Sequence, residues 1–472
     1  MDKLSLQLTE NIAEFDRILS VKENYDMLKR VFRIGTRQAC FYFIDGFHKD
    51  EILQRLLQYY ADLENEDTPE SLQQLMQQHM PYGELELVTG KEALIAAILS
   101  GKPGLLVDGF DTAITVDFRN YPARSVSEPD KDKAMRGSKD GFVETLVFNT
   151  ALIRRRIRTP EFMIEMLSAG RSSKTDIAVC YMSNRVDKKF LNEIKERINQ
   201  INVDALTMNQ QSLAECLFQG KWIDPFPKFK FSERPDTAAA CILEGCIVLL
   251  VDNSPAAMIL PASIFDIVEE ADDYYFPPIT GTYLRLSRLF INILALVLTP
   301  LFMLVSKNPE YLPEMFAFVA IKDPVNIPLI WQFLILEFMV DGLRLASLNT
   351  PNMLSTPLSV ISGLVIGEFT VSSGWFNAEA MLYMAFVTIA NYTQVNFELG
   401  YALKFLRILT IVLTWFFGIW GFAGGLLFAA FAILANRTVA GKSYLYPLIP
   451  FRPKEFLRRV VRVSLPNSEK KG

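Results

Sequence analysis

The stretch ILTIVLTWFFGIWGFAGGLLFAAFAILAN (residues 408–436) contains no charged residue. An uncharged apolar run of more than about 18 residues is typical of a helix that crosses a membrane. As one straight helix it would be roughly 43 Å long, which exceeds the ~30 Å thickness of the hydrocarbon core. The run therefore predicts a membrane-spanning helix that tilts or projects beyond the bilayer. It also excludes a wholly soluble protein.

Further apolar segments precede this run, near 286–306, 327–345, 353–373 and 379–397. The segment near 327–345 is short and charged, so we expect a re-entrant or interfacial helix there. The chain after residue 436 is rich in Lys and Arg, and such clusters normally stay in the cytoplasm. About four full spans would place both ends of a membrane domain (281–440) on the cytoplasmic side, with a basic cytoplasmic tail over 441–472. This arrangement leaves Lys404 and Arg407 on the far side.

Three charged residues in the second apolar segment share one face of a helix. Glu337, Asp341 and Arg344 are spaced i, i+4 and i+7. Charge inside a membrane is costly and tends to face a bundle interior or a water-filled path, so these residues are candidates for an ion pathway. The alternative is a self-neutralising cluster in which Arg344 pairs with both acids.

Other polar residues of the apolar segments extend this candidate pathway. Glu368 has no charged neighbour in the sequence, and Asn391 and Gln394 lie in the fourth segment. An unpaired intramembrane carboxylate marks a functional site by default, although Glu368 at a helix end would also reach the headgroups. We therefore include Glu368, Asn391 and Gln394 in the hypothesis.

Composition argues against an enzyme. Hydrophobic residues make up 50% of the 472 residues, charged residues 21%, and there are two His and five Cys. The His and Cys residues lack the spacing of a metal site, and we find no hydrolase, protease or kinase signature. The sequence predicts no cofactor, no metal, no nucleic-acid partner and reduced, buried thiols. Residues 1–4 do not resemble the start of a cleaved signal peptide.

An internal repeat organises the first 280 residues. CFYFIDGFHKDEILQRLLQYY (40–60) and AVCYMSNRVDKKFLNEIKERI (178–198) both indicate a strand, a turn and a helix. GLLVDGFDTAITVD (104–117) and CIVLLVDNSPAAMILP (246–261) form a second matching pair, in which Val107-Asp108-Gly109 corresponds to Val251-Asp252-Asn253. The offsets are similar, as in a duplicated domain.

The predicted fold is therefore an α+β (α/β) cytoplasmic region of two similar subdomains, followed by an all-α polytopic membrane domain. Each subdomain is expected to be a mixed sheet with helices packed on it. The first subdomain covers 1–135, and a linker helix with the second subdomain covers 136–280. The Arg-rich run near 154–158 is expected to lie on a solvated or inter-domain face.

Three stretches of the sequence resemble one known family. SVSEPDKDKAMRGSKDGFVETLVFNTALIRRRIRTPEF (125–162), PFPKFKFSERPDTAAACILEGCIVLLVDNSP (225–255) and DDYYFPP (272–278) are similar to the A subunits of GerA-type spore germinant receptors. Ser138 departs from the receptor pattern, which favours a stage V sporulation branch. The resemblance marks motif residues with an inter-domain or assembly role: Glu128, Pro129, Arg136, Gly137, Glu144, Asn149, Arg154, Arg156, Arg234, Pro235, Asp252 and Pro255.

The resemblance implies a multi-pass protein of the spore inner membrane that acts in germination. It implies a cyclic homo-oligomer, with a pentamer as one arrangement, that passes small ions beside other spore membrane proteins. Acidic side chains commonly line cation pores, which fits the pathway hypothesis. Two alternatives stay open, namely an accessory transporter of spore solutes and a non-conducting scaffold.

Overall fold

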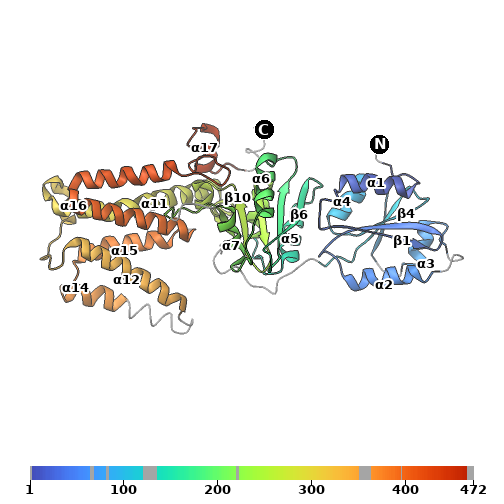
Figure 1. Cartoon of the computed structure of the whole chain (residues 1–472), viewed down its shortest axis with the longest axis horizontal. Helices are drawn as coiled ribbons and strands as arrows, with labels where there is room; N and C mark the ends of the chain where they lie inside the picture. Colours follow the sequence, from blue (N-terminus) through green and yellow to red (C-terminus); the bar gives the residue numbers. More distant parts are fainter. Residues whose placement is uncertain are drawn as a thin grey trace. The chain divides into compact units, whose positions relative to one another are not determined.

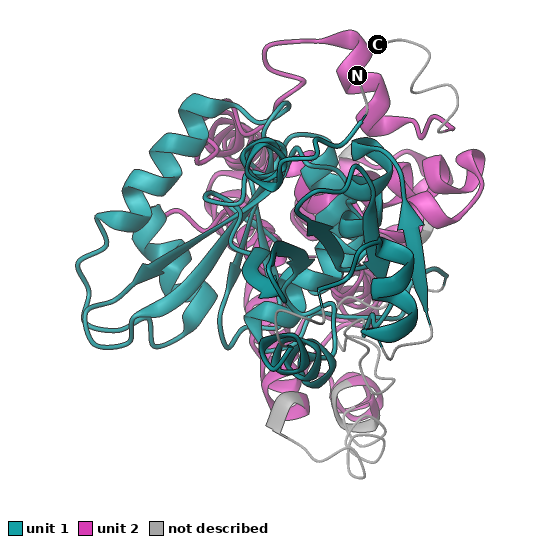
Figure 2. Cartoon of the chain, turned by 90° about the vertical axis from the view of Figure 1, so that its right-hand side faces the viewer, with its two compact units in different colours: residues 1–220, 229–261 teal, residues 221–228, 262–472 magenta. Residues whose placement is uncertain are grey.

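The computed structural model describes residues 3–63, 68–80, 84–120, 136–218, 223–349, 363–394 and 396–464. The chain forms two compact units, one from residues 1–220 and 229–261 and the other from 221–228 and 262–472 (Figure 2). Both sheets belong to the first unit, and the second unit is helical. This confirms the predicted order of a two-subdomain α/β region followed by an all-α region.

The first unit contains two five-stranded sheets with the same strand order. The first sheet is ordered β1-β2-β4-β5-β3 and the second β6-β7-β9-β10-β8. Their strands are β1 (Met27–Ile34), β2 (Arg37–Ile44), β3 (Leu85–Val88), β4 (Gly104–Val107), β5 (Ala113–Val116), β6 (Phe162–Ala169), β7 (Thr175–Met182), β8 (Lys230–Ser232), β9 (Ile247–Val251) and β10 (Ala257–Leu260).

All strand pairs in these two sheets are antiparallel, so the expectation of mixed sheets is wrong. The reason lies in the turns. β1 and β2 are joined through a tight turn at Gly35, whose φ is +57°, and β4 and β5 through a turn at Gly109, whose φ is +88°. Short turns of this kind join neighbouring strands as hairpins, which are necessarily antiparallel.

Helices cover both faces of each sheet (Figure 1). In the first subdomain, β2 directs Cys40, Tyr42 and Ile44 toward one hydrophobic cluster and Phe41 and Phe43 toward another. A strand buried on both faces is apolar throughout, which explains its sequence. The helices are α1 (Leu8–Ile18), α2 (Asp50–Ala61), α3 (Leu72–Gln78) and α4 (Lys91–Leu99), followed by α5 (Leu146–Arg154), α6 (Lys188–Asn199), α7 (Asn209–Leu217) and α8 (Pro235–Leu243).

The duplication extends to single hydrogen bonds at the start of each subdomain. Asn11 in α1 binds the backbone N–H and carbonyl of Ser5, at 2.9 and 2.7 Å. Asn149 in α5 binds the same two groups of Val143, at 2.8 and 2.5 Å. Each Asn therefore fixes the chain that enters its helix.

A second pair of equivalent contacts involves the predicted Val-Asp motifs. Asp108 Oδ1 accepts a hydrogen bond from Leu8 N at 2.9 Å, and Asp252 Oδ1 accepts one from Leu146 N at 3.3 Å. A carboxylate is favoured at a helix N-terminus, because the first amide groups there lack partners within the helix. These contacts explain why both repeats contain an Asp directly after a buried strand.

The second unit contains one long helix pair and several shorter helices. They are α9 (Ile264–Val268), α10 (Asp272–Tyr275), α11 (Pro278–Lys307), the 3₁₀ helices η2 (Pro309–Tyr311) and η3 (Glu314–Val319), α12 (Leu329–Asn349), the π-helix η4 (Gly363–Phe369), α14 (Thr370–Ser372), α15 (Ala378–Tyr392), α16 (Phe397–Ala435) and α17 (Pro453–Val460). Within the described residues, α11 and α16 are long and apolar enough to cross a membrane.

α16 reverses direction at Gly418, whose φ of +58° and ψ of −132° are not helical. A side-chain carbon added at Gly421 would lie 1.9 Å from the carbonyl oxygen of Leu413, and one added at Gly425 would lie 2.8 Å from Thr410. Residues 410 and 425 would be roughly 22 Å apart in a straight helix. α16 therefore consists of two limbs, 397–417 and 419–435, and the prediction of one straight helix over 408–436 is wrong (Figure 1).

Contacts along α11 show how these limbs run. Lys307 Nζ at the end of α11 donates to Trp415 O at 2.6 Å, close to the reversal. At the other end, Ile264 N donates to Tyr444 O at 3.0 Å, so the chain that enters α11 meets the chain that leaves α16. The first limb thus runs parallel to α11, and the second limb runs antiparallel to it.

Replacing Gly425 by Leu should separate the two limbs of α16, because no room exists for a side chain beside Thr410. We expect a loss of about 1–3 kcal/mol in the free energy of unfolding, measured by thermal or denaturant unfolding in detergent. The matched control is Gly424→Leu, since a side-chain carbon at Gly424 meets nothing within 4 Å. Equal effects of both variants would contradict the close packing of the limbs.

Candidate functional site

A buried charge network joins α11, α12 and α16 in the second unit. Arg407 on α16 binds Glu337 Oε1 on α12 through Nε at 2.7 Å and Nη2 at 2.6 Å. Its Nη1 donates to the carbonyl oxygen of Ala295 on α11 at 2.8 Å. Arg407 is fully buried and Glu337 is 2% exposed. Each ion thus depends on the other, since an isolated charge at such a position would be very costly.

Lys404 completes this charge network, one helical turn before Arg407. Its Nζ forms an ion pair with Asp341, donates to Glu337 O at 3.1 Å, and lies 3.4 Å from Glu337 Oε2. The two acids are four residues apart on α12, and the two cations are three residues apart on α16. Each pair therefore lies on one face of its helix. Two acids and two cations therefore balance one another.

Arg344 does not take part in the charge balance, so the alternative in which it pairs with both acids is wrong for the described residues. Within the described residues, the ion pairs of Glu337 and Asp341 are with Lys404 and Arg407. The guanidinium of Arg344 instead lies 5.3–5.6 Å from the ring centroids of Tyr392, Phe397 and Tyr401. Aromatic faces attract cations at such distances, so these rings replace a carboxylate partner.

A small polar pocket adjoins the charge network between α12, α15 and α16. Its lining includes Asp341, Arg344, Asn391 and Lys404. The Oδ1 atom of Asn391 and the Nε atom of Arg344 are buried without a hydrogen-bond partner among the described residues. The pocket thus brings together three of the predicted pathway residues and presents two unused polar atoms.

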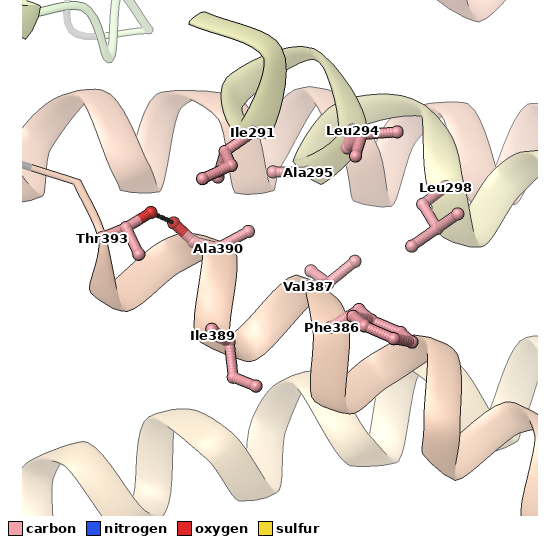
Figure 3. A pocket seen from close by; sticks show the side chains of 9 residues that line it. All are labelled: Ile291, Leu294, Ala295, Leu298, Phe386, Val387, Ile389, Ala390 and Thr393. Carbon is pink, nitrogen blue, oxygen red and sulfur yellow. Dashed lines mark hydrogen bonds between the residues drawn. The ribbon is translucent and has the colours of Figure 1, made fainter. Parts of the chain in front are cut away.

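The neighbouring pocket between α11 and α15 is apolar (Figure 3). Its side chains include Leu294, Leu298, Phe386 and Val387, and its hydroxyl group, on Thr393, donates to Ala390 O at 2.8 Å. Such a lining offers no free ligand for an ion. The polar character of this bundle is therefore concentrated on the side that faces α12.

The two remaining pathway candidates lie apart from the charge network. Gln394, between α15 and α16, donates to the side chain of Asn292 and to Ala390 O at 3.3 Å. Glu368 is exposed on η4 and forms no ion pair with a described residue. The partners Lys404 and Arg407 were not predicted from the sequence, although two cations at the start of an apolar run must be neutralised when they are buried.

In the first unit, Arg154 connects the two subdomains. It is fully buried in α5 and binds both carboxylate oxygens of Asp26, at 2.7 and 2.9 Å, directly before β1 of the first sheet. It also donates to Phe162 O at 3.0 Å, and its guanidinium lies 4.3 Å from the Phe162 ring centroid. Arg154 therefore lies at the contact between the two subdomains.

Two other motif arginines converge on the loop before α5. Arg156 Nη2 contacts Asp140 Oδ2 at 2.6 Å, and Arg234 Nη2 donates to Ser138 O at 3.2 Å. Burial disfavours the charged form of Asp140, but hydrogen bonds from Arg156 and Ser138 outweigh it and lower the pKa of this carboxyl. These contacts tie α5 and α8 to one loop.

The remaining motif residues have mostly local roles. Pro235 begins α8, Gly137 adopts a φ of +101°, and Glu144 O accepts a hydrogen bond from Asn253 N at 2.8 Å. Arg136 and Pro255 are exposed. Glu128 and Pro129 lie outside the described residues.

The chain thus combines a duplicated α/β region with apolar helices that contain a buried charge network. This combination defines a class of membrane-associated proteins. The model of the Bacillus/Clostridium GerA spore germination protein family matches residues 15–472. The chain therefore belongs to this family, as the sequence resemblance predicted.

Two relatives from Bacillus subtilis agree with this assignment. The chain is 31% identical over 461 residues to stage V sporulation protein AF of Bacillus subtilis (strain 168), covering 98% of this chain and 93% of that protein. It is 26% identical to spore germination protein KA of the same organism, covering 99% and 86%. The N-terminal domain of the A subunit of the Bacillus megaterium germinant receptor GerK3 matches 55% of this chain and 96% of that domain, with 26% identity and a TM-score of 0.43.

Replacing Arg407 by Met should leave Glu337 buried without the guanidinium that contacts its Oε1 atom. We expect a loss of about 3–5 kcal/mol in the free energy of unfolding in detergent. Arg437→Met is the matched control, because Arg437 is exposed. A loss below about 1 kcal/mol for Arg407→Met would show that the ion pair is dispensable.

Asp140→Asn should reduce stability in a pH-dependent way. The folded state lowers the pKa of Asp140, so its carboxylate stabilises the fold at pH values above its unfolded pKa of about 3.9. This advantage is lost as the pH falls through the lowered pKa, where Asp140 is protonated in both states. Thermal unfolding of the full chain, followed by circular dichroism, should show a Tm difference at pH 7 that disappears in strong acid. A pH-independent difference would contradict the ionic role of Asp140.

Proposed function

We propose that the chain is an ion-conducting subunit of the spore germination machinery, and that Glu368 lies on its ion path. Membership of the germination family and two helices long enough to cross a membrane support this role. The observation that carries the proposal is that the carboxylate of Glu368 is exposed and forms no ion pair with a described residue. Glu368 lies on the largely apolar helix η4, whereas Glu337 and Asp341 have buried cationic partners.

The charge network itself is a poor cation path. A permeating cation would compete with Lys404 and Arg407 for the same two carboxylates, and Arg344 adds a further positive charge. Cation pores use acidic side chains that remain available to the ion. We therefore assign Glu337, Asp341 and Arg344 to the wall of the pathway, with Asn391 and Gln394 as polar neighbours, and Glu368 to its lumen.

A homo-oligomer would provide the surroundings that Glu368 lacks in one copy. An unpaired carboxylate in lipid is costly, and it becomes acceptable when it faces a water-filled path enclosed by protein. A cyclic arrangement of copies, a pentamer by family resemblance, would place one Glu368 from each copy around such a path. Other spore membrane proteins are the expected partners.

We also propose that the soluble region and the basic tail lie in the cytoplasm, at the spore inner membrane. The chain that enters α11 and the chain that leaves α16 meet at Ile264 and Tyr444, which favours an even number of crossings. The reversal at Gly418 supplies a return crossing that the sequence did not predict. α12 is one uninterrupted helix of 21 residues, about 30 Å long, so its paired charges no longer argue for a re-entrant segment.

The second candidate function is an accessory or scaffold subunit, which supports the release of spore solutes without conductance of its own. The charge balance of the buried network favours it, because Glu337 and Asp341 are paired with cations of the same chain and are not available to a ligand. In this case Glu368 would contact a partner or the headgroups, and its replacement would change assembly and not ion flux.

Conductance of the purified oligomer in planar bilayers distinguishes these functions. Glu368→Gln should lower single-channel conductance and cation selectivity, because the pore loses one charge per copy. Glu51→Gln, an exposed acid in α2 of the first unit, is the matched control and should leave both unchanged. Silent bilayers from folded, oligomeric protein would favour the scaffold. Conductance that Glu368→Gln does not alter would move the pathway elsewhere.

A further inference from the structure

One face of α11 carries a continuous stripe of exposed large side chains. They are Ile279, Tyr283, Leu286, Phe290 and Ile293, with exposed fractions of 81, 68, 47, 61 and 61%. Their spacing alternates between four and three residues, which places them along one side of the helix. This stripe begins before the most apolar part of α11 and continues into it, so it would extend from the membrane interface into the hydrocarbon region.

At its outer end, the stripe borders a groove between α11 and the C-terminal segment. Residues Pro278, Ile279, Thr282, Tyr283 and Leu286 form one side, and Val461 and Arg462 form the other. The backbone N–H of Arg462 donates to Thr282 Oγ1 at 3.1 Å. Gly281 allows this approach, since a side-chain carbon there would lie 3.0 Å from Arg462 Cδ.

Arg462 has no carboxylate partner among the described residues, and its guanidinium lies 6.0 Å from the ring centroid of Tyr274. Nearby arginines differ, because Arg285 binds Glu269 at 2.6 Å and Arg459 binds Asp266 at 2.7 Å. The Nη2 atom of Arg462 donates to Tyr274 O, but its Nε and Nη1 atoms have no hydrogen-bond partner within the described chain. Leaving buried donors unused is costly, so a ligand that accepts from them would be stabilised.

We propose that this groove binds an anionic phospholipid, with the phosphate at Arg462 and an acyl chain along the α11 stripe. The planar guanidinium matches the geometry of a phosphate, and anionic headgroups attract cations at the membrane surface. Tyr283 lies between the cation and the apolar part of α11, where aromatic residues are favoured at the interface. To reach the phosphate, the guanidinium turns away from the Tyr274 carbonyl.

A lipid fits this surface better than a second copy of the chain. Interfaces between membrane helices favour small residues that let backbones approach, and the stripe contains none. A protein partner would also have to supply a carboxylate at the headgroup level to satisfy Arg462. The inference rests on the proposed crossing of the membrane by α11, and it is independent of ion conductance.

Native mass spectrometry of the full chain, released from bilayers of phosphatidylcholine and phosphatidylglycerol, tests this site. Wild-type protein should retain phosphatidylglycerol in preference to phosphatidylcholine, and Arg462→Gln should lose one retained phosphatidylglycerol per chain. The matched control is Lys454→Gln, which removes the same charge from an exposed position on α17 and should lose none. A second variant, Tyr283→Ser, should lose the same lipid without any change of charge.

Several outcomes would overturn the proposal. Equal losses in Arg462→Gln and Lys454→Gln would indicate diffuse attraction of lipids to a basic surface. Equal retention of the two lipids by wild-type protein would show that no anionic site exists. A change of oligomeric mass in Tyr283→Ser, with lipid retention unchanged, would identify the stripe as a contact between copies.

Discussion

The ion pair between Arg407 and Glu337 determines how the helical unit can be assembled. Both groups are buried between apolar helices, where neither charge is tolerable alone. Arg407 also binds the carbonyl of Ala295, so this pair joins α12 and α16 to α11 at that residue. Lys404 and Asp341 repeat the arrangement one turn away.

The first unit relies on the same principle at the contact between its two subdomains. A fully buried arginine, Arg154, holds Asp26 of the other subdomain across 128 residues of sequence. The two subdomains are otherwise duplicates, down to the Asp252 and Asp108 carboxylates that accept from the first helix of each. Arg154 belongs to the second subdomain and Asp26 to the first, so the contact that joins the two subdomains uses a different residue from each.

Much of this architecture could be predicted from the sequence, because it depends on local patterns. Matching strand, turn and helix signals revealed the duplication, and apolar runs revealed the helical unit. The sequence also placed Glu337 and Asp341 on one face, but it offered only Arg344 as a partner for them, because the partners in the structure are more than 60 residues away. The reversal at Gly418 could not be predicted, because a glycine within an apolar run does not indicate whether the helix continues or turns back. The role of Glu368 in an ion path stays a prediction, because neither the sequence nor the structure tests it.

A double-mutant cycle between Glu337 and Arg407 tests the central claim most directly. The free energy of unfolding would be measured in detergent for the wild type, Glu337→Leu, Arg407→Met and the double variant. Because each single variant removes one partner of a buried ion pair and leaves the other charge in place, the account predicts that the double variant is more stable than the sum of the two losses implies, by about 1–3 kcal/mol. Strictly additive losses would show that the two residues do not interact, and would contradict the account.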